Sequence, residues 1–265
     1  MLLAIDVGNT NIVFGSFDGA KLSAHFRLAT DHRRTPDEYG VLLRAMLVDA
    51  GLNPKDIAGV VMASVVPPLS DVLRAMCHER LKREPLVVGP GIKTGMPILT
   101  DNPREVGADR VVNGVAAYER FRHAPGGPFG LVIVDFGTAT TFDVVSPKGE
   151  YLGGAISPGV MIAAEALYEN AAKLPRIELV MPATAIGKST VTSMRSGILF
   201  GYAGLVDGMV ARMKGELDFA PKVIATGGLA PLVKSCAQSI ESVDEFLTLE
   251  GLRIIHERNE RGERA

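Results

Sequence analysis

The sequence contains an internal repeat, and this repeat constrains the fold more than any other feature. The segment LLAIDVGNTNIVFGSF begins at residue 2 and LVIVDFGTATTFDVVS begins 129 positions later, so that Asp6 aligns with Asp135 and Gly8 with Gly137. Each copy has a short apolar run, an Asp-x-Gly group with a polar cluster, and a second run rich in β-forming residues. We interpret each copy as a buried strand, a tight polar turn and an antiparallel return strand.

Helices and strands are predicted to alternate after each hairpin. Residues 35–51 carry apolar side chains at helical spacing, with Pro36 near the start and Gly51 at the end, which is typical of a helix. The charged tail at 257–265 is expected to be a solvated, fraying end. The other predicted elements are a strand at 57–66, a helix from an N-cap at Ser70 to residue 83, a strand at 85–89, helices at 108–121, 160–172 and 192–214, a strand at 222–226 and a helix after Gly228.

The glycine- and proline-rich segment at 124–128 is the predicted linker between the two halves. We therefore expect two domains, residues 1–123 and 124–265, each opening with its own hairpin. A duplicated α/β pattern of this kind indicates a nucleotide-binding architecture, with the ligand at strand ends in the cleft between the halves.

Composition and charge exclude several classes of protein. Of the 265 residues, 47% are hydrophobic and 22% are charged, which predicts a packed core and excludes wholesale disorder. The formal net charge of -2 argues against a dedicated nucleic-acid partner. The two cysteines lie far apart and the histidines form no paired motif, so neither a disulfide framework nor a zinc site is expected. No segment resembles a signal peptide or a membrane span, so we expect a cytoplasmic protein without a membrane partner.

The two Asp-x-Gly turns have the residue types that bind metal–phosphate groups. A carboxylate at the end of a buried strand can hold a hard cation directly or through water. Gly8 and Gly137 allow the backbone to approach a phosphate closely, and the short polar side chains that follow them supply donors. Either turn alone is compatible with an ordinary Asp-Gly hairpin. Two copies in register favour phosphate binding.

A third polar cluster, DNPREVGADRVVNG at residues 101–114, places Asp109 and Arg110 near the start of the predicted helix at 108–121. One interpretation of Asp109 is a favourable charge at a helix N-terminus. The alternative is a general base for a substrate hydroxyl, with Arg110 binding a substrate carboxylate.

Three further motifs are weaker. The segment GKS at 187–189 looks like the end of a P-loop, but Pro182 stands where that motif needs glycine. The pair Cys77-His78 is interpreted as part of an ordinary helix rather than as a catalytic dyad. Gly227-Gly228 fits either a plain strand-to-helix turn or close packing against a nucleoside.

Five motifs together resemble type III pantothenate kinase in their order and spacing, over almost the whole chain. They are DVGNT at 6–10, NPREVGADR at 102–110, DFGTATT at 135–141, GGAISPG at 153–159 and TGGLA at 226–230. That family belongs to the acetate and sugar kinase, Hsp70 and actin superfamily. The resemblance therefore implies an α/β, duplicated ribonuclease-H-like (actin-like) fold, with two α/β domains, mixed five-stranded sheets and an interdomain cleft.

The resemblance also implies ATP-dependent phosphorylation of pantothenate to 4'-phosphopantothenate, the first step of coenzyme A biosynthesis. The implied ATP-binding residues are Asp6, Val7, Gly8, Asn9, Thr10, Asn11, Ile12 and Val13 in a first phosphate loop, Gly137 and Thr138 in a second, and Gly227 and Gly228 beside the adenosine. The implied pantothenate-binding residues are Thr100, Gly107, Ala108, Asp109, Arg110 and Thr190, with Asp109 as the catalytic proton acceptor. Asp135 would bind a monovalent cation, K⁺ or NH₄⁺, and Asp6 would meet the Mg²⁺ of ATP through water.

Residue Thr190 matches a family substrate contact that is reached across a dimer interface, so the resemblance implies a homodimer. The chain departs from the family pattern at Thr100, where many members have Tyr, and at Ser189, where Asn is common. Neither change removes a residue assigned to phosphoryl transfer.

Two alternative functions remain open from the sequence. The first is another small-molecule kinase of the same superfamily, such as a sugar or acetate kinase. The second is a regulatory accessory factor of the same family with weak or no kinase activity. Retention of Asp6, Asp109, Arg110 and Asp135 favours the kinase over the regulatory factor.

Overall fold

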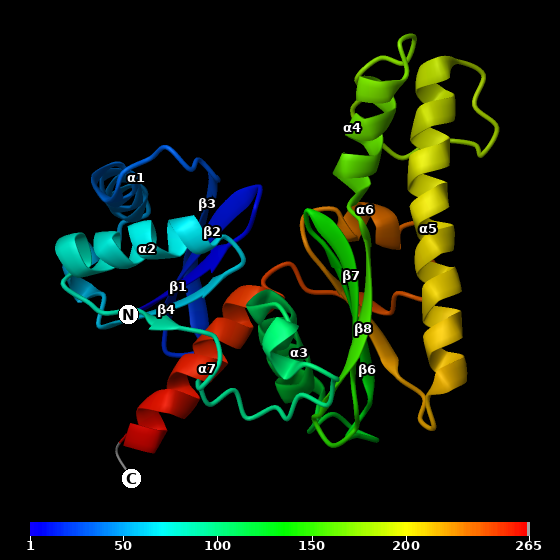
Figure 1. The fold of residues 1–265 in the computed structure, drawn as a ribbon. Helices are drawn as coiled ribbons and strands as arrows, with labels where there is room; N and C mark the ends of the chain where they lie inside the picture. The colour runs from blue at the N-terminus through cyan, green and yellow to red at the C-terminus, as the bar shows by residue number, and fades with distance from the viewer. Residues whose placement is uncertain (264–265) are drawn as a thin grey trace. The chain divides into compact units, whose positions relative to one another are not determined.

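The computed structural model describes residues 1–263 and forms two compact units, each with one five-stranded sheet and several helices (Figure 1). Unit 1 contains residues 1–96, 102–116 and the C-terminal segment from Thr248, and unit 2 contains Pro97–Asp101 and Ala117–Leu247. These units group the C-terminal helix with the N-terminal sheet. The predicted domain boundary between residues 123 and 124 stays a prediction.

The first sheet has the strand order β3-β2-β1-β4-β5 and the second has β10-β9-β6-β7-β8. The strands of the first sheet are β1 (Leu2–Val7), β2 (Asn11–Asp18), β3 (Lys21–Ala29), β4 (Gly59–Ser64) and β5 (Leu86–Val87). Those of the second are β6 (Leu131–Phe136), β7 (Ala139–Val145), β8 (Tyr151–Pro158), β9 (Lys222–Thr226) and β10 (Ser242–Val243).

The two sheets share one topology, which confirms the duplication that the repeat predicts. In the first sheet β1 pairs antiparallel with β2 and parallel with β4. In the second sheet β6 pairs in the same way with β7 and β9. Each sheet is therefore mixed, and its central strand is the one that ends in the Asp-x-Gly turn.

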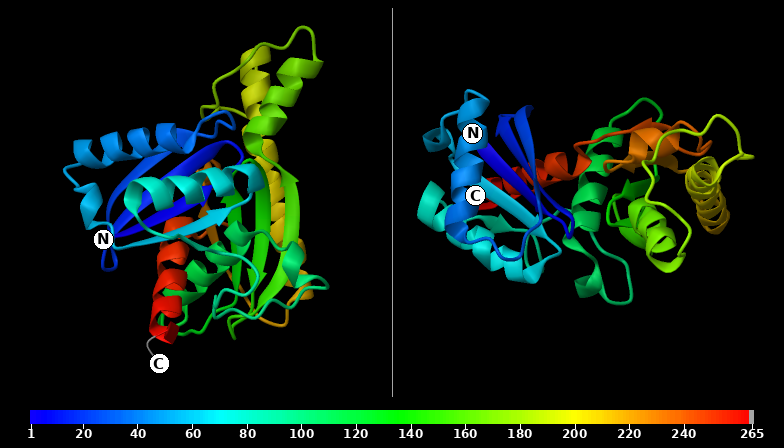
Figure 2. Two further views of the ribbon diagram at one scale, coloured as in Figure 1. Left: turned by 60° about the vertical axis from the view of Figure 1, so that its left-hand side comes forward. Right: turned by 90° about the horizontal axis from the view of Figure 1, so that it is seen from above.

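Long helices bury the apolar faces of the sheets. The helices are α1 (Pro36–Asp49), α2 (Pro67–Met76), α3 (Ala108–Phe121), α4 (Val160–Asn170), α5 (Thr190–Glu216), α6 (Ala230–Lys234) and α7 (Leu247–Glu263), with short helical turns at Pro54–Asp56, Cys77–Leu81 and Pro103–Glu105. In unit 1, α1 and α2 lie side by side on one face of the sheet (Figure 2), and their apolar residues share a core with β1 and β4. In unit 2, α5 and α6 complete a second core with β6, β7 and β9.

Two local predictions are wrong. Ser70 does not cap α2, because that helix already begins at Pro67, which fits a first helical turn where no N–H donor is needed. The Ser70 hydroxyl instead donates to the Val66 carbonyl at 3.3 Å. The predicted fraying end at 257–265 is wrong for residues 257–263, since α7 continues through them to Glu263. The Asn259 side chain bonds the backbone N–H and carbonyl of Lys93, at 3.2 and 3.1 Å, which orders this part of the helix. Residues 264–265 lie outside the described part.

Helix α7 packs directly on α3, the helix that carries Asp109. A Cβ placed on Gly251 of α7 would lie 2.2 Å from the Val112 carbonyl oxygen of α3. Beside this contact, the Thr248 hydroxyl lies 2.8 Å from Asn113 Oδ1. Glycine at position 251 thus sets the distance between the two helices. Within residues 1–263, no helix is both long enough and apolar enough to cross a lipid bilayer.

We expect Gly251→Ala to lower the free energy of unfolding by about 1–3 kcal/mol, because the new methyl group overlaps the Val112 backbone. Gly201→Ala in α5 is the control, since an added Cβ there meets nothing within 4 Å and alanine favours a helix by about 1 kcal/mol. Urea denaturation of both variants measures the difference. A Gly251→Ala protein as stable as Gly201→Ala would show that α7 does not pack on α3 in this way.

Candidate active site

The first Asp-x-Gly turn joins the central strand β1 to β2. Asp6 pairs with Val13 and Val7 with Ile12, so the turn contains residues 8–11. The Gly8 N–H donates to the Asn11 carbonyl at 3.0 Å and closes it. Asn9 and Thr10 at its tip are exposed.

The second turn repeats this geometry with one residue fewer. Asp135 pairs with Thr141 and Phe136 with Thr140, and the Gly137 N–H donates to the Ala139 carbonyl at 3.0 Å. The strand pairing is therefore the same in both copies through the two aspartates, and the two hairpins differ only in the number of residues in the turn.

Glycines from two other segments press against the second turn. Gly227 follows β9 with a φ of +90°, and a Cβ there would lie 2.7 Å from Asp135 Oδ1 and 2.6 Å from the Phe136 carbonyl oxygen. A Cβ on Gly159, at the start of α4, would lie 2.1 Å from the Thr138 carbonyl oxygen. Both positions therefore require glycine on grounds of space, and Gly227 requires it on conformational grounds as well.

Asp109 lies in the first turn of α3. The Gly107 carbonyl accepts from the N–H groups of Arg110 and Val111, at 3.1 and 3.3 Å, and starts the helix. Asp109 Oδ1 accepts from the Arg110 N–H at 2.8 Å. A Cβ on Gly107 would lie 2.5 Å from this same oxygen, so the carboxylate occupies the space that a side chain at 107 would need.

Burial raises the pKa of Asp109 above the ordinary aspartate value, and this effect outweighs the opposing hydrogen bond and positive charge of Arg110. A carboxyl group with a raised pKa is a better proton acceptor than an ordinary aspartate. The Cys77 thiol behaves differently. Burial raises its pKa to about 12, so the thiolate form is disfavoured at neutral pH, which argues against a catalytic dyad. Cys77 begins a π-helical turn that follows α2, so the predicted ordinary helix ends earlier, at Met76.

The predicted site residues are divided between the two units. Unit 1 holds the first turn and the start of α3, with Gly107, Ala108, Asp109 and Arg110. Unit 2 holds the second turn, Gly227, Gly228, Thr100 and Thr190. Thr190 is the exposed first residue of α5, next to a capping box in which Ser189 Oγ accepts from the Thr192 N–H at 3.3 Å.

The oxygen-rich surroundings of Asp135 fit a hard cation. Its carboxylate and the Phe136 carbonyl oxygen both lie against Gly227, so oxygen ligands of two kinds are close together. No cluster of three or more His, Cys, Asp or Glu side chains suited to a metal occurs in the part of the chain that the structure describes. The Asp135 carboxylate and the Phe136 carbonyl are oxygen donors of the kind that a hard cation takes.

Sequence reasoning missed Thr30, which contacts the first turn from the end of β3. Its hydroxyl donates to the Gly8 carbonyl at 2.6 Å, and its N–H donates to the Thr10 carbonyl at 3.0 Å. No motif near residue 30 in the sequence predicts this role, because the contact arises from the β2–β3 register. The role of Gly159 was also missed, although its motif was part of the resemblance.

The Type III pantothenate kinase family model matches residues 2–212. A curated relative named type III pantothenate kinase, from Anaeromyxobacter sp. (strain K), is 60% identical over 259 residues, which cover 98% of this chain and 100% of the relative. The chain belongs to the type III pantothenate kinase family. The resemblance that the five motifs indicate is thereby confirmed.

Solved structures agree with the fold of this family member. A conserved putative Baf family transcriptional activator from Campylobacter jejuni has a TM-score of 0.61 at 19% identity, covering 98% of this chain and 99% of that one. An inorganic polyphosphate/ATP-glucomannokinase from Arthrobacter sp. strain KM has a TM-score of 0.52 at 16% identity, covering 98% of both chains. With the matched sheet topologies, these similarities confirm the duplicated ribonuclease-H-like fold.

We expect Gly227→Ala to destabilise the protein by about 1–3 kcal/mol more than Gly91→Ala. Both glycines have a positive φ, but an added Cβ at Gly91 meets nothing within 4 Å, whereas one at Gly227 overlaps the Asp135 carboxylate and the Phe136 backbone. Thermal unfolding of the two variants separates the steric effect from the conformational one. Equal losses would show that the second turn is not packed against Gly227.

Proposed function

We propose that this chain transfers the γ-phosphoryl group of ATP to the primary hydroxyl of pantothenate, giving 4'-phosphopantothenate in the first step of coenzyme A biosynthesis. The observation that carries the proposal is the 60% identity, over nearly the full length, to a relative of that name. The two Asp-x-Gly turns and the half-buried Asp109 carboxyl support it, because they supply the groups that phosphoryl transfer to an alcohol needs.

The first phosphate loop, Asp6–Val13, and the second, with Gly137 and Thr138, are proposed to bind the phosphates of ATP through turn N–H groups and short side chains. Gly227 and Gly228 are proposed to lie beside the adenosine. Mg²⁺ bound with ATP would neutralise phosphate charge, with Asp6 holding it through water and Asp135 holding K⁺ or NH₄⁺.

Asp109 is proposed to accept the proton of the pantothenate hydroxyl as its oxygen attacks the γ-phosphorus. Arg110 is proposed to bind the pantothenate carboxylate in a forked pair, which fixes the hydroxyl near Asp109. Because the transition state for phosphoryl transfer is loose, positioning and charge neutralisation supply most of the acceleration. The hydrogen bond from the Arg110 N–H holds the Asp109 carboxylate in one orientation.

Thr100 is proposed to contact pantothenate at the position where many relatives have tyrosine. Its hydroxyl oxygen is buried and has no hydrogen-bond partner among residues 1–263. Because a buried hydroxyl without a partner is costly, a polar group of the substrate would satisfy it. The smaller side chain is expected to widen the pocket relative to tyrosine.

A homodimer is proposed, with Thr190 reaching the substrate of the partner subunit. Helices α4 and α5 extend side by side beyond the second sheet (Figure 1), and this extension exposes large apolar side chains. Ile186 is 82% exposed, Met161 46% and Ile162 44%. An exposed apolar surface of this kind supports association with a second copy. The cytoplasmic location stays a prediction.

Replacing Asp109 with Asn is expected to lower turnover by about 10²–10⁴-fold, which is the usual contribution of a general base. Asp101→Asn, an exposed carboxylate in the preceding loop, is the control and should keep normal turnover. Steady-state kinetics with saturating ATP and pantothenate measure both. Near-normal turnover of Asp109→Asn would rule out the base assignment.

The same variant has a predicted effect on stability. Burial raises the pKa of Asp109 in the folded state. The protonated carboxyl therefore contributes to the stability of the fold at low pH, and this contribution is lost as pH rises through the folded-state pKa. At neutral pH the wild-type protein must bury an ionised carboxylate, whereas the side-chain amide of the Asp109→Asn variant is neutral. We expect Asp109→Asn to raise the melting temperature at pH 7 and to change it little at pH 4. A lower melting temperature at pH 7 would contradict the burial of the charge.

ADP formation in the presence and absence of pantothenate, in potassium and in sodium buffer, tests substrate and cation together. We expect formation of ADP to require pantothenate and to be faster in potassium. Turnover with a sugar or acetate in place of pantothenate would indicate another kinase of the superfamily. No turnover with any acceptor, combined with DNA binding that needs neither ATP nor pantothenate, would indicate the regulatory factor.

A further inference from the structure

Thr30 joins the end of β3 to the first phosphate loop at two points. β3 ends at Ala29, which pairs with Asn11, and Thr30 is the next residue. The Thr30 hydroxyl donates to the Gly8 carbonyl at 2.6 Å, and the Thr30 N–H donates to the Thr10 carbonyl at 3.0 Å. One residue outside the loop therefore holds two of its carbonyl groups.

These two hydrogen bonds fix the orientation of two peptide groups in the loop. In a planar trans peptide, the carbonyl and the following N–H point to opposite sides. Because the Gly8 carbonyl points to Thr30, the Asn9 N–H points away from it, and the same holds for the Thr10 carbonyl and the Asn11 N–H. Without the Thr30 hydroxyl, the peptide after Gly8 would rotate more freely, since glycine has few backbone restrictions.

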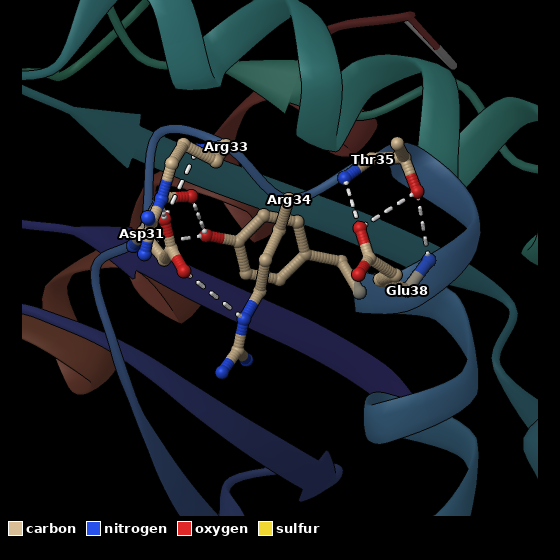
Figure 3. Close-up of polar contacts among 6 residues, drawn as sticks. Asp31, Arg33, Arg34, Thr35 and Glu38 are labelled. Carbon is tan, nitrogen blue, oxygen red and sulfur yellow. Dashed lines mark hydrogen bonds and ion pairs between the residues drawn. The ribbon is translucent and has the colours of Figure 1, made fainter.

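Thr30 is itself held by the core of unit 1. The hydroxyl of Tyr39, a fully buried residue of α1, donates to the Asp31 carbonyl at 2.9 Å and accepts from the Asp31 N–H at 3.3 Å. Thr35 and Glu38 form the capping box that starts α1, with the Thr35 N–H donating to Glu38 Oε2 at 2.7 Å (Figure 3). The backbone next to Thr30 is thus held by the core, and this fixes the position from which Thr30 contacts the loop.

The carboxylate of Asp31 orders the rest of this connection. It accepts from the Arg33 N–H at 3.0 Å, and this hydrogen bond lowers the pKa of Asp31 (Figure 3). The side chain therefore stays ionised at neutral pH and keeps accepting from the segment that leads to α1. The connection from Thr30 to the helix start is thereby fixed by Tyr39 at one end and by the capping box at the other.

We propose that Thr30 is a positioning residue for the ATP phosphates, which acts through Gly8 and Thr10 and does not itself touch the substrate. The inference rests on the proposed function, because it takes the first turn as a phosphate loop. One hydroxyl at the end of a neighbouring strand thereby sets the direction of the loop N–H groups.

The test compares Thr30→Val, which keeps the shape but removes the hydroxyl, with Thr30→Ser, which keeps the hydroxyl. We expect Thr30→Val to lower kcat/KM for ATP about 10-fold, as the loss of an orienting hydrogen bond predicts. The KM for pantothenate should stay unchanged. Thr30→Ser should remain within about twofold of the wild-type protein for both substrates.

A second readout separates failure of this inference from failure of the proposed function. Calorimetric titration with magnesium and a non-hydrolysable ATP analogue measures nucleotide binding without any acceptor. Weaker binding by Thr30→Val than by Thr30→Ser supports the inference even if pantothenate proves not to be the acceptor. Inactivity of the wild-type protein toward pantothenate would overturn the proposed function alone.

Two results would overturn the positioning role. One is unchanged ATP kinetics and nucleotide binding in a folded Thr30→Val protein. The other is an equal loss for ATP and pantothenate that follows the loss of melting temperature, because a merely structural role predicts this. If Thr30→Val does not fold, Tyr39→Phe replaces it, since it removes the anchor of Asp31 and should impair ATP binding selectively. Unchanged nucleotide binding by a folded Tyr39→Phe protein would then overturn the role.

Discussion

Antiparallel pairing immediately after each central strand determines where the two Asp-x-Gly turns lie. β1 and β6 each have a neighbouring strand on both sides, and their aspartates, Asp6 and Asp135, lie next to the strand end where the chain reverses. The reversal is closed by the Gly8 N–H on Asn11 in one unit and the Gly137 N–H on Ala139 in the other. A buried strand, a closed turn and an antiparallel return strand together place a short turn at the carboxyl end of the central strand.

The two turns are supported by different means. The first is held by hydrogen bonds from Thr30, whose position depends on the buried Tyr39. The second is held by close contact with Gly159 and Gly227, where side chains would overlap the turn. A hydroxyl fixes the direction of peptide groups, whereas contact between backbones fixes their position. Duplication thus supplied one topology, and the packing around each turn gave each copy its own constraint.

Much of the fold is predictable from the sequence because its signals are local. The repeat around Asp6 and Asp135 predicts the hairpins, and Pro36 and Gly51 bracket α1 correctly. Asp109 was placed at a helix start by its own neighbours. Thr30 was not predictable, since its role arises from strand register, and Ser70 was misassigned because the prolines before it begin the helix earlier. The packing of α7 depends on Gly251 and Asn259, which contact residues far away in the sequence, and a charged composition does not reveal such contacts.

Transfer of the γ-phosphoryl group from ATP to the primary hydroxyl of pantothenate is the reaction proposed for this protein. Phosphorus NMR of the reaction mixture, with the product quantified against ADP, tests it directly. We expect one phosphomonoester, carried on the primary hydroxyl of pantothenate and formed in equal amount to ADP. ADP accompanied by free phosphate, or no phosphorylated pantothenate with a folded protein in potassium and magnesium, would contradict it.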